Sequence, residues 1–153
     1  MESGPVEEGA LPILPCGCAS LRRASRAVTQ LYDTELRGTG LNTPQFTLLQ
    51  VLARAGRVGQ GQLGRMLVLD STTLSRTLRP LEERKWIHVR PGADRRERQI
   101  ELTAAGRSQL ERATRAWDRG QRRLIARFGR RRWAAFQGEL ARIAGLAATV
   151  SRT

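Results

Sequence analysis

The sequence has 153 residues, of which 40% are apolar, and its formal net charge is +13 at pH 7. This length suits a single domain with a sizeable core, and the charge indicates a polyanionic partner, for which double-stranded DNA is the leading candidate. No run of 18 apolar residues is present, so the sequence predicts no membrane span. The single histidine leaves little machinery for acid–base catalysis, so we expect a binding protein rather than an enzyme, with no cofactor.

Residues 1–14 are rich in Gly, Pro and Glu, and we expect this segment to be disordered. It begins with acidic and small residues, unlike the basic and then apolar pattern of a secretory signal. Two cysteines cannot supply a disulfide scaffold for a domain of this size. We therefore expect a cytoplasmic protein in which residues 15–153 form one domain.

The stretch 16–37 is amphipathic, because Leu21, Ala24, Val28 and Leu31 recur at steps of three and four residues. A narrow apolar seam of this kind predicts a helix that packs against another helix.

A second helix is predicted to begin at Thr43, as the N-cap, with Pro44 in its first turn, and to end near residue 54. A glycine-rich turn follows, with room for a short edge strand at 57–58, and then a short helix over 60–67.

The stretch 70–85 is predicted to be a helix that reads DNA. Asp70 or Ser71 can cap it. The apolar residues of one face are Leu74, Leu78 and Leu81. The opposite face carries hydroxyl and guanidinium groups, which suit phosphates and base edges in a major groove. The residues of this helix that we assign to DNA are Ser71, Thr72, Thr73, Ser75, Arg76 and Arg79.

Two alternating segments, 86–90 and 98–102, predict a β-hairpin whose turn contains Pro91 and Gly92. Its basic tip suits DNA, although a solvated hairpin on a basic protein is the alternative. The residues assigned to DNA at the hairpin are Asp94, Arg95, Arg96 and Arg98. Arg96 is expected to enter a minor groove, and Asp94 to hold Arg95 or Arg96 in an extended pose. Thr43 and Gln45 are further candidates, as phosphate ligands at a helix N-terminus.

Thr103 is expected to cap a long helix that ends at Gly129, before a last helix with a regular apolar seam. The residues of that seam are Trp133, Phe136, Leu140, Ile143, Ala147 and Val150. The seam predicts assembly between subunits, and packing within one subunit is the alternative. Between the two seams lies an arginine run, which we interpret as a solvated face or as a second contact with DNA or an acidic partner. The run consists of Arg119, Arg122, Arg123, Arg127, Arg130, Arg131 and Arg132.

Cys16 and Cys18 lie at the start of the first helix, where the positive end of the helix dipole favours anions. Inert thiols, redox sensing and metal binding all remain open for this pair, although a C-x-C pattern with one distant histidine is poor zinc spacing.

The motif Asp94-Arg95-Arg96, followed by the stretch from Ile100 to Gly106, resembles the D-x-R wing and L-T-x-x-G helix start of the MarR family. The stretch 71–82 resembles the recognition helix of that family, and the similarity in element order spans roughly residues 16–150. The resemblance implies a mainly α fold with a small β-hairpin wing. A winged helix-turn-helix would occupy about residues 42–103, with dimerisation helices over about 16–37 and 104–151.

The resemblance further implies a homodimeric transcriptional regulator, most simply a repressor that a small-molecule effector releases from a pseudo-palindromic operator. Small aromatic effectors would bind between the dimer helices and the DNA-binding lobe, where Arg26 and Tyr32 could face them. The spacing of Cys18 and Tyr32 is also similar to that in the organic-hydroperoxide-sensing branch of the family, which implies an oxidant-sensing repressor as an alternative. A second alternative is a sequence-indifferent architectural DNA-binding protein.

Overall fold

The computed structural model describes residues 11–94 and 97–150. It is mainly helical, with one small antiparallel sheet, as the sequence predicted. The elements in chain order are α1 (Gly17–Leu36), a 3₁₀ turn (Arg37–Thr39), α2 (Thr43–Ala55), β1 (Val58–Gly59), α3 (Gln60–Leu67), α4 (Ser71–Glu83), β2 (Ile87–Pro91), β3 (Arg98–Leu102), α5 (Ala104–Phe128) and α6 (Arg130–Val150).

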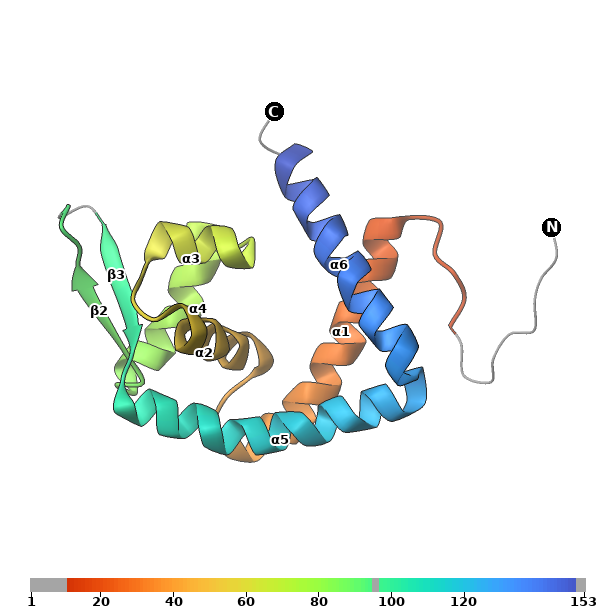
Figure 1. The fold of residues 1–153 in the computed structure, drawn as a ribbon, viewed down its shortest axis with the longest axis horizontal. Helices are drawn as coiled ribbons and strands as arrows, with labels where there is room; N and C mark the ends of the chain where they lie inside the picture. Colours follow the sequence, from red (N-terminus) through yellow and green to blue (C-terminus); the bar gives the residue numbers. More distant parts are fainter. Residues whose placement is uncertain (1–10, 95–96, 151–153) are drawn as a thin grey trace.

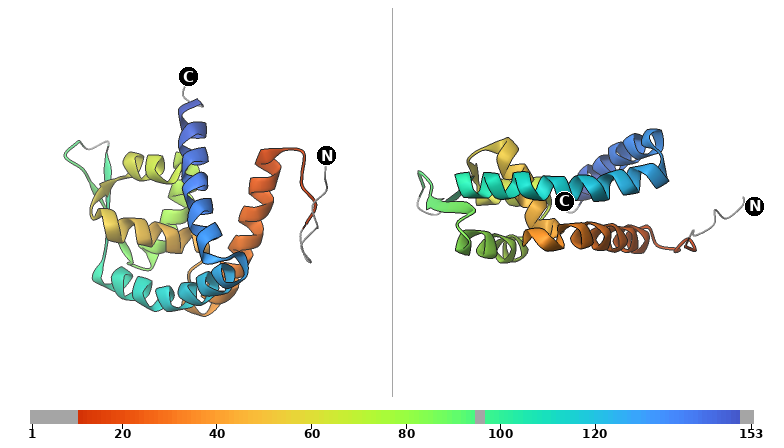
Figure 2. Two further views of the ribbon diagram at one scale, coloured as in Figure 1. Left: turned by 45° about the vertical axis from the view of Figure 1, so that its right-hand side comes forward. Right: turned by 90° about the horizontal axis from the view of Figure 1, so that it is seen from below.

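Helix α5 is the base of the molecule (Figure 1). The lobe formed by α2, α3, α4 and the sheet stands over its first half, and α1 and α6 rise from its second half. Figure 2 shows that α1 and α6 lie on different sides of α5. The hairpin β2–β3 and the α5–α6 corner therefore lie toward opposite ends of the molecule. Among the described residues, no helix combines the length and apolar composition that crossing a membrane requires.

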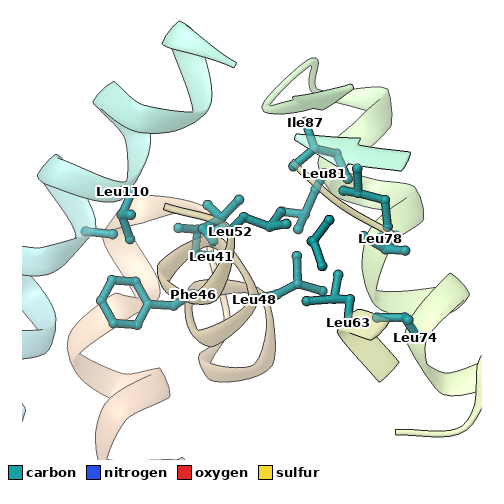
Figure 3. Close-up of a cluster of buried hydrophobic side chains, with 14 of the residues drawn as sticks. Leu41, Phe46, Leu48, Leu52, Leu63, Leu74, Leu78, Leu81, Ile87 and Leu110 are labelled. Carbon is teal, nitrogen blue, oxygen red and sulfur yellow. The ribbon is translucent and has the colours of Figure 1, made fainter. Parts of the chain in front are cut away.

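One hydrophobic core joins α2, α3, α4, the sheet and α5 (Figure 3). The three leucines predicted for the inner face of α4 are all buried: Leu74 is 1% exposed, Leu78 4% and Leu81 0%. Burial of each such side chain stabilises the fold by roughly 1.5–3 kcal/mol. Because one side of α4 is held in this core, its other side is fixed toward solvent.

The sheet has the strand order β1-β3-β2. Ile100, at the centre of β3, is opposite Val58 of β1 on one side and Val89 of β2 on the other. The predicted edge strand therefore exists, shifted by one residue to Val58–Gly59, and it joins the hairpin to the region before α3.

The predicted cap of α2 is wrong by one residue. The N-cap is Asn42, whose side-chain Oδ1 accepts from the backbone N–H of Gln45 at 3.0 Å. The Gln45 side-chain Oε1 in turn accepts from the backbone N–H of Asn42 at 3.2 Å, which completes a capping box. Thr43 is therefore the first residue of the helix, and Pro44 the second.

The start of α5 is locked against the start of the wing. The Thr103 side chain caps α5 as predicted, accepting from the N–H of Gly106 at 2.9 Å, and its hydroxyl donates to the Lys85 carbonyl at 2.8 Å. The N–H of Thr103 donates to the Trp86 carbonyl at 3.1 Å. A Cβ at Gly106 would lie 2.8 Å from the Trp86 carbonyl carbon and closer still to its oxygen. Only glycine fits this contact.

Replacing Gly106 with alanine should therefore lower the free energy of unfolding by about 3 kcal/mol, because the new methyl group must push two backbone segments apart. The matched control is Gly138→Ala, in an exposed part of α6 where a Cβ meets nothing within 4 Å. The control should raise stability by roughly 0.5–1 kcal/mol. Urea denaturation of both variants measures the difference, and a Gly106→Ala protein as stable as wild type would contradict the close packing.

Candidate nucleic-acid interface

The outward face of α4 forms a shallow groove of about 400 Å³. Its lining residues, all exposed and all predicted from the sequence, are Ser71, Thr72, Ser75, Arg76 and Arg79. The helix thus presents short hydroxyls and guanidinium groups along one side, while its leucines are buried on the other. This arrangement can donate hydrogen bonds to phosphates and to base edges.

Thr73, also assigned to DNA from the sequence, has a structural role in this arrangement. Asp70 is the N-cap of α4, and its carboxylate accepts from the Thr73 N–H at 2.9 Å and from the Thr73 hydroxyl at 2.6 Å. The bond from the Thr73 hydroxyl has the larger effect and the bond from its N–H the smaller, and both hold the pKa of Asp70 below its usual value. The Thr73 hydroxyl is therefore already engaged within the cap.

The two arginines of the groove differ in their partners. Arg79 Nε lies 2.9 Å from Glu83 Oε1, one helical turn further along α4. Arg76 makes no ion pair or hydrogen bond within the part of the chain that the structure describes. The side chain of Arg76 is exposed, so its N–H donors are available to a ligand.

The wing carries an ion cluster that the sequence analysis missed. Glu101 Oε2 lies 3.0 Å from Arg57 Nη2, and Glu101 Oε1 lies 3.7 Å from Arg90 Nε. The hydrogen bond from Arg57, together with the charges of Arg57 and Arg90, lowers the pKa of Glu101. No local sequence signal links these groups, because the pairing of β3 with both neighbouring strands brings them together.

The tip of the wing is described only in part. Asp94 and Arg98 are exposed there, and Arg98 Nη2 lies 4.0 Å from Glu82 Oε2 of α4. Arg95 and Arg96, to which we assigned the minor-groove contact, lie outside the described residues. The expected hold of Asp94 on these two arginines therefore stays a prediction.

The expected phosphate site at the start of α2 is not open. The N–H and the hydroxyl of Thr43 both donate to Asp33 Oδ1, each at 2.7 Å. The Gln45 side chain is engaged in the capping box with Asn42. An intramolecular carboxylate thus occupies the place that the sequence analysis gave to a phosphate.

Tyr32, which we assigned with Arg26 to an effector pocket, is buried between α1 and α5 in this chain. Tyr32 is 6% exposed, stacks on Trp117 with ring centroids 6.1 Å apart, and donates its hydroxyl hydrogen to Gln121 Oε1. Arg26 is exposed on α1. Tyr32 is therefore part of the contact between α1 and α5, and burial raises its pKa.

Cys16 and Cys18 are both exposed free thiols, at the N-cap and second residue of α1. Fourteen residues of helix separate Cys18 from Tyr32, which corresponds to about 21 Å. The two residues that matched the peroxide-sensing pattern are thus apart within one chain. Among the described residues, no three His, Cys, Asp or Glu side chains gather in a possible metal site.

The arginine run at the α5–α6 corner divides into two groups. Arg119 Nε and Arg123 Nη1 lie 3.2 and 2.6 Å from the carboxylate of Glu35 on α1. The hydrogen bond from Arg123 has the larger effect and that from Arg119 the smaller, and both lower the pKa of Glu35. All the arginines of the run are exposed, and these two also tie α5 to α1.

Comparison with known proteins agrees with this geometry. A model of the MarR family matches residues 39–97, which span the 3₁₀ turn to the wing. The structure of the M. tuberculosis transcriptional regulator MosR in complex with DNA has a TM-score of 0.80 and 32% identity, and the match covers 88% of this chain and 98% of that one. The chain belongs to the MarR family. Its members are DNA-binding transcriptional regulators.

Two further relatives are consistent with this assignment. The transcriptional repressor CouR, bound to a 23-mer DNA duplex, has a TM-score of 0.77 and 27% identity, over 84% of this chain and 92% of that one. An HTH-type transcriptional regulator of Bacillus subtilis, YwoH, is 28% identical over 91 residues. That stretch is 60% of this MarR-family chain and 66% of YwoH, just under two thirds of its length.

Proposed function

We propose that this MarR-family protein is a sequence-specific repressor that binds a pseudo-palindromic operator as a homodimer. The observation that carries the proposal is the outward face of α4, where Ser75 and Arg76 line an open groove while the opposite leucines are buried. The lobe over about residues 42–103 would read DNA, and α1, α5 and α6 would join two copies. The DNA-bound structures of MosR and CouR support this proposal by their similarity.

The dimer is supported by the exposure of α6. Within a single chain none of its residues is buried, and the side chains of Phe136, Ile143, Leu146 and Val150 are 37–75% exposed. Phe128, Trp133 and Phe136 hold the start of α6 to the end of α5 through ring contacts. The rest of the seam, beyond Phe136, needs a partner, because an apolar stripe about 20 Å long is unfavourable in water. A second copy of this chain would cover it and would set the two α4 helices about 34 Å apart, one turn of DNA.

Release from DNA by a small molecule would require a site that touches α4. A cavity of about 830 Å³ lies beside the start of α4, between α3, the wing and the end of α6. Its lining includes Gly64, Leu69, Ser71 and Leu74, and its volume lies within the range of small-molecule sites. A ligand there would affect DNA binding only through different affinities for the two states.

A sequence-indifferent architectural protein is the competing function, and selective DNA binding separates the two. The operator is first located by footprinting. Replacing Arg76 with alanine should then weaken binding to this operator by about 1–3 kcal/mol, and it should relax the base preference at one position in each half-site. The matched control is Arg122→Ala, which removes the same charge from an exposed site on α5.

Fluorescence anisotropy over a series of salt concentrations provides the measurement. If about ten phosphates are neutralised, log K against log salt should have a slope near −9. Equal affinity for operator and random duplexes would favour the architectural function. Equal losses in both variants would show that only net charge matters.

The proposed dimer makes a separate prediction. A glutamate in place of Ile143, which is 45% exposed on the seam, should give monomers and weaken operator binding. The reason is that a charge cannot be buried between two helices without a partner. Ala141→Glu introduces the same charge at an exposed residue away from the seam, and should leave a dimer. Sedimentation velocity distinguishes these results, and a dimeric Ile143→Glu protein would remove α6 from the interface.

Release by an oxidant is the second candidate function, and the exposure of both thiols at the start of α1 favours it. A hydroperoxide would oxidise the Cys18 thiolate to a sulfenic acid and leave as the alcohol. Cys18→Ser should then bind the operator normally but no longer dissociate when cumene hydroperoxide is added. Cys16→Ser is the control, and equal release of wild type and Cys18→Ser would exclude sensing by Cys18.

A further inference from the structure

A hydrogen bond crosses from α3 to the outward face of α4, which is the face proposed to read DNA and is called the reading face below. Gln60, the first residue of α3, donates from its side-chain Nε2 to the hydroxyl oxygen of Ser75 at 3.2 Å. Ser75 is exposed and lines the groove on α4. The amide of Gln60 thus contacts Ser75, but Gln60 does not line the groove itself.

The direction of this bond decides what Ser75 can offer to a ligand. A hydroxyl has one hydrogen and two lone pairs, and an amide nitrogen only donates. The oxygen of Ser75 therefore accepts from Gln60 through one lone pair, and it keeps its own hydrogen and its second lone pair. Two other hydroxyls of α4 donate within the helix, since Thr73 donates to Asp70 and Thr77 donates to the Thr73 carbonyl at 3.0 Å. Among the described residues, Ser75 donates to no acceptor.

The cost of this arrangement indicates that it has a role. The other polar atom of the amide, Gln60 Oε1, is buried and has no hydrogen-bond partner within the described part of the chain. A buried acceptor without a partner is unfavourable for folding. A glutamine at this position is therefore hard to explain by stability, and within the described residues its side chain makes one hydrogen bond, to Ser75.

We propose that Gln60 sets the specificity of the recognition helix by leaving the Ser75 hydrogen available to donate to DNA. In a major groove such a donor matches purine N7, guanine O6 and thymine O4. Cytosine offers no acceptor to this hydrogen, because its edge presents only the N4 donor. This inference rests on the proposed function, because it needs α4 to lie in the groove of an operator.

The test uses the full-length protein and a duplex obtained by selecting a random library with the wild type. Each base of one half-site is then replaced in turn, and the affinities of wild type and variants are compared. In wild type, one position should lose about three- to tenfold in affinity when cytosine replaces the selected base. Ser75→Ala should lose this discrimination at that position alone.

Gln60→Glu reverses the polarity of the bond. A carboxylate at residue 60 would accept the Ser75 hydrogen and leave only the hydroxyl oxygen for the groove. The discrimination against cytosine at the same position should then disappear or invert. Gln62→Glu, at an exposed residue of the same helix, adds the same charge and should keep the wild-type preference. Circular dichroism melting curves verify that each variant is folded.

Three results would overturn the inference. A uniform loss of affinity in Ser75→Ala, with all base preferences kept, would make Ser75 a phosphate contact. An unchanged preference in folded Gln60→Glu would show that Gln60 does not set the polarity of Ser75. If the wild type selects no sequence at all, the proposed function fails as well. If the wild type selects a sequence and either of the first two results is found, only the inference about Gln60 fails.

Discussion

The burial of one leucine face of α4 is the constraint on which the reading surface depends. Leu74, Leu78 and Leu81 pack into the core shared by α2, α3, the sheet and α5, so α4 cannot rotate without exposing them. At roughly 1.5–3 kcal/mol for each side chain, the loss would be comparable with the whole stability of a typical domain. The groove with Ser75 and Arg76 is therefore held in one orientation before any DNA is present.

The position of the wing follows from a second constraint, which is made by backbone rather than by side chains. The carbonyl of Trp86 accepts from Thr103, and Gly106 leaves room for that carbonyl at the start of α5. Strands β2 and β3 leave this joint together, and β1 pairs with β3 from the other side. A movement of α5 would therefore carry the wing with it. In the proposed dimer, a change in the packing of α1, α5 and α6 would reach the lobe formed by α2, α3, α4 and the sheet through this coupling.

The sequence predicted those parts of the structure that depend on neighbouring residues. The inner face of α4, the Thr103 cap and the end of α5 at Gly129 are local signals of period and capping, and the structure confirms them. The cap of α2 was placed one residue too late because Asn42 and Thr43 are both good N-caps. The bonds to Gln45 and Asp33 decide between them, and the second of these is a tertiary contact.

What the sequence could not show depends on contacts between distant residues. Tyr32 was assigned to an effector pocket, but Trp117 and Gln121 of α5 bury it. The pairing of β1 with β3 places Arg57 beside Glu101, and the turn between α3 and α4 places Gln60 beside Ser75. No period or spacing encodes such pairs. The residues of the α4 groove were nevertheless predicted in full, because a helix with one buried face necessarily exposes the other.

The charges and the hydroxyls of this interface do different physical work. A net charge of +13 draws the protein to any duplex, and that attraction depends on salt but hardly on sequence. A hydroxyl whose hydrogen can rotate also discriminates little, because it can donate to one base and accept from another. Specificity requires that this freedom be reduced. In this fold Asp70 accepts the hydrogen of the Thr73 hydroxyl, and Gln60 occupies one lone pair of the Ser75 oxygen. Selectivity would then depend as much on residues that never contact DNA as on those that do.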